Sequence, residues 1–144
     1  MRIRDILRRK GDLVATVPPA TTVRDLLSVL AEHNIGAAVV SADGAAINGI
    51  VSERDVVRHL HARGAGLLGV PVTEIMTAHV RTCSPDDRVE DVRQSMTEHR
   101  FRHLPVVVDG RLAGIVSIGD VVKSSIDALE SEREHLVGYI QQSP

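Results

Sequence analysis

The chain carries one sequence pattern twice, and this duplication limits the folds that it can adopt. Residues 16–44 align with residues 82–110 without a gap, and residues 46–57 align with residues 111–122. Of these 41 aligned pairs, 16 are identical. The strongest match is Gly-Ile-Val-Ser-x-x-Asp-Val-Val, which begins at Gly49 and returns 65 residues later. A repeat of about 66 residues is too long for a solenoid unit, so the duplication predicts two copies of one small α/β unit packed together.

Each copy has the pattern of a β-α-β-β-α unit. An extended piece is followed by a helix with apolar residues at helical spacing, and Thr22 with Asp25 three residues later is typical of a helix start. Two short strands follow, joined by an Asp-Gly dipeptide that favours a tight turn. A second helix is expected to begin at the repeated serine. The strands are predicted at residues 13–17, 37–40 and 48–52, and again at residues 80–83, 104–108 and 112–117.

The duplication also predicts how the chain is divided. Residues 1–66 are expected to form the first repeat, residues 67–125 the second, and residues 126–144 a helical C-terminal extension. A short leading helix is expected before each repeat, because the apolar spacing of residues 3–7 returns at residues 72–76. Neither copy alone has enough apolar surface for a stable core. The predicted fold class is therefore α/β, with the two repeats packed in pseudo-two-fold symmetry.

The C-terminal extension has two possible roles. Ile126, Leu129, Leu136 and Ile140 lie near heptad spacing, although Arg133 interrupts the series. The helix can pack on its own domain, or it can form a contact with a second copy. The sequence leaves both interpretations open.

Composition excludes several classes of protein. Phe101 and Tyr139 are the only aromatic residues, so the core must be built from Val, Ile, Leu and Ala. The 17 Lys and Arg residues against 19 Asp and Glu residues provide no global field for a polyanion, and a nucleic-acid partner is not expected. Without an apolar run of about 18–20 residues or a signal peptide, we expect no membrane association and a cytoplasmic location. Cys83 is the single cysteine and allows no intrachain disulfide.

Catalytic and metal-binding patterns are also missing. The chain has no Gly-x-Ser-x-Gly motif, and the sequence places no base beside Ser52. His59 and His61 are two residues apart, so on a helix they point in different directions. No set of cysteines and histidines has the spacing of a zinc site. We therefore expect neither an enzyme nor a metal site nor a catalytic cofactor.

The repeated Ser-x-x-Asp allows two interpretations. Ser52 with Asp55, and Ser117 with Asp120, stand where a strand turns into a helix. A serine at the N-cap and an acidic residue three positions later satisfy free backbone amides of the first turn. The same groups suit a polyhydroxyl ligand, because a carboxylate can accept two hydrogen bonds from a ribose diol.

Taken together, these motifs resemble a tandem CBS-domain protein (a cystathionine β-synthase domain pair, or Bateman module) of the small bacterial stand-alone type. The resemblance covers residues from about 3 to 125. It rests on Gly-Ile-Val-Ser-x-x-Asp in both copies, on His-Arg-Phe-Arg-His-Leu-Pro-Val at residues 99–106, and on Ile-Met-Thr at residues 75–77. The resemblance implies binding of an adenosine compound, such as AMP, ADP, ATP, S-adenosylmethionine or NAD, in clefts between the repeats.

The resemblance also implies two non-equivalent clefts. In each cleft the aspartate of one repeat holds the ribose, while the other repeat supplies the adenine wall and phosphate contacts. The first cleft is expected to combine Ile50, Ser52, Asp55, Val80, Arg81, Phe101, Arg102 and His103. The second is expected to combine Ile115, Ser117, Asp120, Val14, Ala15, Ile35, Gly36 and Ala37, with Lys10 as a possible phosphate ligand.

The two clefts differ at matched positions. Arg102 and His103 of the second copy align with Gly36 and Ala37 of the first. An arginine can chelate phosphate oxygens, so the Asp55 cleft is expected to prefer a phosphorylated nucleotide. The predicted function is a nucleotide-binding regulatory sensor that acts as a homodimer or on a separate regulated protein. The alternative is a structural, dimerising adaptor with unoccupied clefts.

Overall fold

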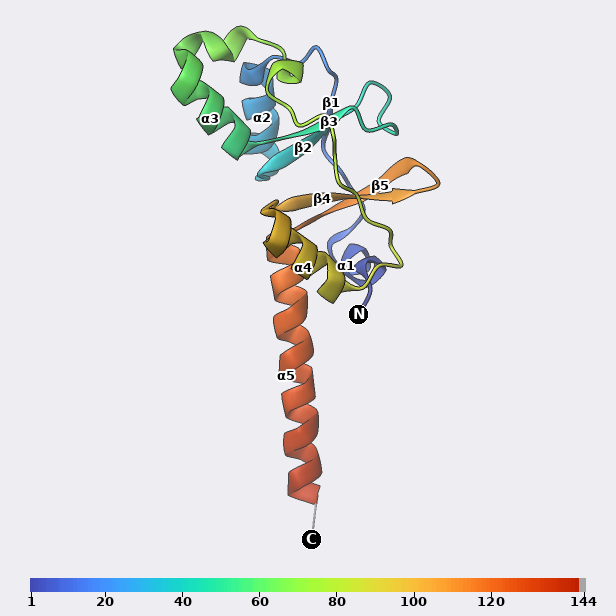
Figure 1. The fold of residues 1–144 in the computed structure, drawn as a ribbon. Helices are drawn as coiled ribbons and strands as arrows, with labels where there is room; N and C mark the ends of the chain where they lie inside the picture. Colours follow the sequence, from blue (N-terminus) through green and yellow to red (C-terminus); the bar gives the residue numbers. More distant parts are fainter. Residues whose placement is uncertain (143–144) are drawn as a thin grey trace.

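The structure is a computed structural model that describes residues 1–142, so residues 143–144 of the predicted extension lie outside the described part. Two α/β halves are stacked with their sheets toward each other, and one long helix leaves the second half (Figure 1). The elements of residues 1–63 are α1 (Ile3–Lys10), β1 (Thr16–Val17), α2 (Val23–His33), β2 (Ala37–Val40), β3 (Gly49–Ser52) and α3 (Glu53–Arg63). The remaining elements are the 3-10 helices η1 (Gly64–Gly69) and η2 (Val72–Glu74), then α4 (Val89–His99), β4 (His103–Val108), β5 (Arg111–Ser117) and α5 (Ile118–Gln142).

The two halves share one strand topology, which confirms the predicted α/β pair of repeats. In the first half β1 is parallel to β2, and β2 is antiparallel to β3. In the second half β4 and β5 are antiparallel, and Cys83 takes the place of a third strand as an isolated parallel bridge to Val106. The Cys83 amide donates to the Pro105 carbonyl at 3.0 Å, and the Val107 amide donates back to Cys83 at 2.8 Å. The predicted strand over residues 80–83 is thus reduced to one bridge.

The Asp-Gly turn prediction holds in one copy only. Between β4 and β5, Asp109 and Gly110 both have positive φ, 52° and 76°, as a tight two-residue hairpin requires. In the first copy residues 41–48 form a longer loop between the strands. The Asp43 carboxylate organises this loop by accepting from the amides of Ala45 and Ala46 at 2.9 and 2.8 Å. Ala45, the residue that has no counterpart in the second copy, lies in this longer loop.

Each half is completed by the segment that leads into the other half. Ile3 and Ile6 of α1 are buried in the core of the second half, although they precede the first. Val72 and Ile75, which lead into the second half, are buried in the core of the first. The backbone repeats this exchange, with a bridge from Arg2 to Arg88 and another from Thr22 to Pro71. The predicted leading segments exist, but the second is a 3-10 turn, and both pack on the opposite repeat.

The repeated glycine makes room for the exchanged segments. A Cβ atom at Gly49 would lie 2.9 Å from the Thr77 carbonyl oxygen and 2.5 Å from Met76 Sδ. A Cβ atom at Gly114 would lie 2.9 Å from a methyl carbon of Leu7. Neither glycine is needed for its φ angle. At Gly49 the leading segment crosses so closely that a side chain would meet the Thr77 backbone, whereas at Gly114 it would meet only the end of the Leu7 side chain, which can shift.

Helix α5 packs on its own domain at its start, which is one of the two roles that the sequence left open. Its first turns pack against α1, α4 and β5, and Val121 and Ser124 are buried there. The rest of the helix projects away from both halves (Figure 1), and Leu129 and Tyr139 are 65% and 74% exposed. Within residues 1–142 the distal half of α5 is therefore without an apolar partner.

The core has the aliphatic character that the composition requires. Both clusters are built mainly from valine, leucine, isoleucine and alanine, with Met96 and Cys83 in the second. Burial, together with the nearby Asp87 carboxylate, raises the pKa of the Cys83 thiol to about 12, so the thiol stays protonated. None of the helices within residues 1–142 is long and apolar enough to cross a membrane.

The crossing at Gly49 predicts a steric effect. Gly49→Ala is expected to lower the free energy of unfolding by about 1–3 kcal/mol, because the new methyl group meets the Thr77 backbone. Gly66→Ala is the control, since nothing lies within 4 Å of a Cβ atom there. Urea unfolding measures both variants. Equal stability of the two would contradict close packing at Gly49.

Candidate functional site

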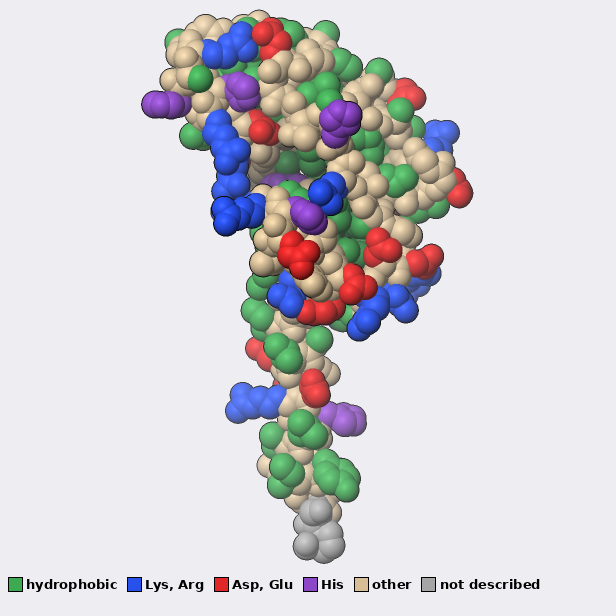
Figure 2. Space-filling view, viewed as in Figure 1, with side chains coloured by type: hydrophobic (Ala, Val, Ile, Leu, Met, Phe, Trp, Pro, Cys, Tyr) green, Lys and Arg blue, Asp and Glu red, His purple; other side chains and the backbone are tan. Residues whose placement is uncertain are grey.

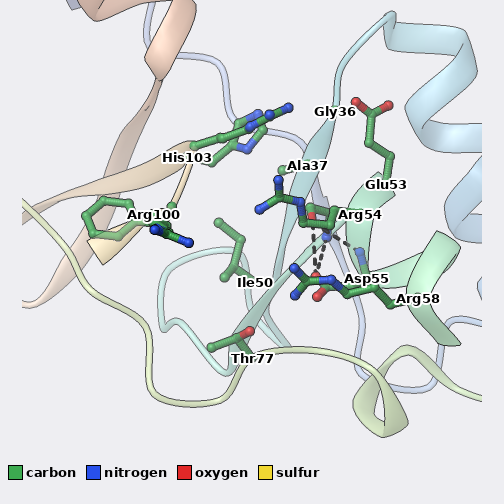
Figure 3. Close-up of a pocket in the computed structure, with 13 residues that line it drawn as sticks. Gly36, Ala37, Ile50, Glu53, Arg54, Asp55, Arg58, Thr77, Arg100 and His103 are labelled. Atoms are coloured by element: carbon green, nitrogen blue, oxygen red, sulfur yellow. Dashed lines mark hydrogen bonds between the residues drawn. The ribbon is translucent and has the colours of Figure 1, made fainter. Parts of the chain in front are cut away.

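A hollow of about 210 Å³ lies where the N-terminus of α3 faces the residues before β4 (Figure 3). We call it the Asp55 hollow. It is lined by both halves: Gly36, Ala37, Ile50, Ser52, Glu53, Arg54, Asp55 and Arg58 from the first, and Thr77, Arg100, Phe101, Arg102 and His103 from the exchanged segment and the second. Six of the eight residues predicted for the first cleft meet here.

The Asp55 carboxylate has a double role at the start of α3. Its Oδ2 atom accepts from the Ser52 amide at 2.8 Å and from the Ser52 hydroxyl at 3.1 Å, and the Asp55 amide donates back to Ser52 Oγ at 3.4 Å. This is the predicted capping box. Within residues 1–142 no side-chain cation pairs with Asp55. Its second oxygen, Oδ1, is thus left for hydroxyl donors.

Arginines surround the same hollow. Arg54, Arg58, Arg100 and Arg102 line it, and none of these guanidinium groups forms an ion pair or a hydrogen bond within residues 1–142. Figure 2 shows lysine and arginine side chains beside the hollowed side between the two halves. The carboxylates of Glu53 and Asp55 balance only part of this charge.

His103 lies where the two repeats meet. Burial lowers the pKa of His103 below its usual value, and the nearby Glu53 carboxylate opposes this only in part. A Cβ atom at Gly36 would lie 3.5 Å from the His103 ring and 3.3 Å from Glu53 Oε1. Gly36 thus leaves room for His103. Gly36 and Ala37, expected in the second cleft, line the Asp55 hollow instead.

In the second half a lysine pairs with the aspartate that corresponds to Asp55. Lys10 Nζ donates to Asp120 Oδ2 at 2.7 Å and to the Ile115 carbonyl at 3.0 Å. Asp120 also caps α5 through Ser117, whose amide donates to Oδ2 at 2.9 Å. A hollow of about 180 Å³, the Lys10 hollow, lies here and is lined by Ile6, Arg9, Lys10, Asp120, Lys123, Ser124 and Asp127. The carboxylate that corresponds to Asp55 is therefore already paired.

The remaining predicted residues lie elsewhere. Val80 and Arg81 line a separate surface hollow together with Ile47, Ala78, His79 and Thr82. Val14, Ala15 and Ile35 line neither the Asp55 hollow nor the Lys10 hollow within residues 1–142. The Ala15 carbonyl accepts from Val39 in the sheet, and Ile35 packs against the first core.

Sequence reasoning missed Glu53, Arg58, Thr77 and Arg100 as lining residues, and it left Arg54 outside the predicted cleft. Arg54 and Arg58 are four residues apart on α3, which places them on one helix face, and this spacing was a usable signal. Arg100 gave no such signal. It enters the hollow because it ends α4 in the left-handed conformation, with φ 57° and ψ 41°.

Comparison with known proteins settles the family. The CBS domain profile matches residues 3–62 and 72–127, which is most of the chain and includes both repeats. The chain belongs to the CBS-domain family. A CBS-domain containing protein from Agrobacterium tumefaciens has 43% sequence identity and a TM-score of 0.84, with 87% of this chain and 99% of that chain covered.

Relatives of this CBS pair differ in length and in their bound ligands. The mitochondrial CBS domain-containing protein CBSX3 of Arabidopsis thaliana is 38% identical over 124 residues, which are 83% of this chain but 60% of that protein. A CBS domain protein from Pyrobaculum aerophilum, solved in complex with AMP, has 29% identity and a TM-score of 0.74 over 83% of this chain and 89% of its own. The CBS domain pair of protein MJ0100, solved with 5′-methylthioadenosine and S-adenosylmethionine, has 25% identity and a TM-score of 0.77 over 89% and 98%.

The Lys10–Asp120 pair predicts an acid-sensitive contribution to stability. Burial tends to raise the pKa of Asp120, but hydrogen bonds from Lys10 and Ser117 outweigh it, so the pKa lies below its usual value. The contribution is present above the unfolded-state pKa of about 3.9 and is lost as pH falls through the lower folded-state pKa. Lys10→Met should cost about 1 kcal/mol at neutral pH and flatten this acid loss.

Urea unfolding between about pH 7 and pH 2, which extends below the unfolded-state pKa, measures this loss, with Arg24→Met as the control on an exposed face of α2. Parallel pH profiles for wild type and Lys10→Met would show that the pair contributes nothing.

Proposed function

We propose that this CBS pair is a non-catalytic regulatory module that binds an adenosine nucleotide in the Asp55 hollow. One observation carries the proposal: the same hollow combines an aspartate with an unpaired carboxylate oxygen and a set of unpaired arginines. In this arrangement Asp55 accepts the ribose hydroxyls, and Arg102 and His103 hold the phosphate. Ile50 and Phe101 form the apolar wall for adenine.

Two further observations support this assignment. The relatives solved with AMP and with S-adenosylmethionine are CBS proteins that bind adenosine compounds. In this chain the Lys10 ammonium already pairs with Asp120, the carboxylate that corresponds to Asp55, and with the Ile115 carbonyl. We therefore propose one nucleotide per chain, in the Asp55 hollow, because the Lys10 ammonium competes with a ligand for the Asp120 carboxylate in the Lys10 hollow.

Regulation requires that the nucleotide binds two conformations with different affinity. The partner in this proposal is the second copy of the chain or a separate regulated protein. The names of the relatives mention no enzyme activity, which agrees with a non-catalytic role. The cytoplasmic location stays a prediction from the sequence.

Asp55→Ala and Asp120→Ala form a matched pair of tests, because each removes the same capping carboxylate from the start of a helix. Asp55→Ala is expected to abolish AMP binding by calorimetry, and Asp120→Ala to retain it. For wild type, AMP at about 100 times its Kd should stabilise the fold by about 2.7 kcal/mol. A panel of AMP, ADP, ATP, S-adenosylmethionine and NAD without any thermal shift would overturn the proposal. Loss of binding only in Asp120→Ala would assign the nucleotide to the other half.

A second function, self-association through α5, is favoured by an independent observation. Val122, Ile126, Leu129, Leu136 and Ile140, here called the α5 stripe, alternate at spacings of four and three residues once Arg133 is included, and they are 43–70% exposed. This is the spacing of a coiled-coil seam. Beyond Ser124 no residue of α5 up to Gln142 is buried, and a short helix without tertiary packing is marginal in water. We propose that α5 of a second copy packs on the stripe and buries its apolar side chains.

Arg133 indicates the orientation of the two helices. In a parallel, in-register pair the two Arg133 side chains would face each other across the seam, which like charges disfavour. In an antiparallel pair each Arg133 faces Leu129 of the second copy and lies next to Glu130 there. The same register brings Val122 against Ile140 and Ile126 against Leu136. The charges therefore favour an antiparallel dimer with two-fold symmetry.

Sedimentation velocity tests this dimer. Wild type is expected to sediment as a dimer, and the double variant Leu129→Glu with Leu136→Glu as a monomer. Ser131→Glu with His135→Glu places the same two charges on the same helix away from the stripe and should leave the dimer intact. Arg133→Leu should tighten it. A double variant that stays dimeric would move the interface to another surface, and a monomeric wild type would remove the proposal.

A further inference from the structure

The Asp55 hollow does not end at the residues that hold one phosphate. A second hollow adjoins it, lined by Arg54, Arg58, Met96, Thr97, Arg100, Phe101, Arg102 and Ile118. Five of these residues, including all four arginines, also line the Asp55 hollow. The two hollows are therefore neighbours that share a wall, and the four arginines form part of it. We call the second one the outer hollow.

Acidic and basic side chains are distributed unequally between the two hollows. Glu53 and Asp55 line only the inner end, where the ribose is proposed to bind. No carboxylate lines the outer hollow within residues 1–142. Four guanidinium groups carry about four positive charges, whereas one phosphate monoester carries about 1.5 to 2 negative charges. Glu53 and Asp55 can balance about two of these charges at the inner end, where a monophosphate balances the remainder. In the outer hollow, which no carboxylate lines within residues 1–142, the guanidinium groups have no such partner, and further phosphates would supply the counter-charge.

The duplication shows that this cluster is a special feature of one half. The positions that correspond to Arg54, Arg58, Arg100 and Arg102 in the other copy are Gly119, Lys123, Asn34 and Gly36. Three of the four positive charges therefore have no counterpart. Shared repeat architecture does not explain the four arginines.

Arg100 adds an observation from the backbone. Both Arg100 and its counterpart Asn34 end a helix in the left-handed region, with φ of 57° and 52°. Asparagine adopts this conformation easily, whereas for arginine it carries a strain of the kind that is often kept at functional positions. The side chain of Arg100 then lines both hollows. The residue that carries this backbone strain therefore also contributes a guanidinium group to both hollows.

We infer that the nucleotide is an adenosine di- or triphosphate, with its terminal phosphates in the outer hollow. This inference rests on the proposed function, because it assumes that the ribose lies at Asp55. The first phosphate lies against Arg102 and His103, and Arg54, Arg58 and Arg100 hold the phosphates beyond it. The ligand class is thereby a polyphosphorylated nucleotide rather than AMP or an uncharged adenosine compound.

Calorimetry with adenosine, AMP, ADP, ATP and inorganic tripolyphosphate, at fixed ionic strength and without divalent cations, tests the inference. ATP is expected to bind wild type at least about 10-fold more tightly than AMP, and its affinity should fall more steeply with added salt. Arg58→Ala and Arg100→Asn should lower the affinity for ATP by a larger factor than the affinity for AMP, so that the two affinities become similar. Arg100→Asn installs the residue of the other copy, so it keeps the backbone conformation. Arg111→Ala, on the exposed β4–β5 hairpin, is the control.

The outcomes separate this inference from the proposed function. Equal affinity for AMP and ATP, unchanged in both arginine variants, overturns the polyphosphate inference and leaves nucleotide binding at Asp55 standing. Binding of tripolyphosphate that is lost in the arginine variants, without binding of any adenosine compound, supports the phosphate positions and overturns the proposed function. No binding of any probe overturns both.

Discussion

The exchange of leading segments is the contact on which the rest of this protein depends. Residues 3–7 complete the core of the second half, and residues 72–76 complete the core of the first, so neither half has a full core without the other. The same crossing fixes the two hollows. After passing over Gly49, the second segment ends at Thr77, which pairs with Ile50 and lines the Asp55 hollow. After passing over Gly114, the first segment ends at Lys10, which reaches Asp120.

This architecture explains how two equivalent caps acquired different surroundings. Ser52 with Asp55 and Ser117 with Asp120 have nearly the same geometry, because a helix start after a strand needs the same hydrogen bonds in either half. What differs is the side chain delivered to each aspartate. Lys10 neutralises Asp120 internally, whereas the groups around Asp55 are arginines that bond to no carboxylate within residues 1–142. The repeat thus retained its structural part and diverged in its charges.

The sequence predicted the repeat topology because its pattern recurs after about 66 residues, and the two helix caps because a cap depends on residues three positions apart. It did not predict the exchange of segments, since Ile3 and Val72 show an apolar spacing but not which sheet they cover. Val80 and Arg81 were expected beside Asp55 and lie in another hollow, because the chain turns away after Thr77. Arg100 escaped detection because its direction depends on one left-handed residue at a helix end. Residue types can be compared directly between the two copies, but the direction in which a side chain points depends on the folded backbone.

One backbone hydrogen bond links the proposed nucleotide site to helix α5. The Arg102 carbonyl accepts from the amide of Ile118, the first residue of α5, at 2.8 Å. In the other half the Gly36 carbonyl accepts from Glu53 at the start of α3, so this contact belongs to the repeat itself. Only in the second half does this contact link an arginine that is proposed to bind phosphate to a projecting helix. A nucleotide that draws Arg102 toward its phosphates therefore acts on the base of α5. Such a displacement can change self-association only if the dimer and the monomer bind the nucleotide with different affinity. By linkage, a change in dimerisation must then be matched by an equal change in nucleotide affinity.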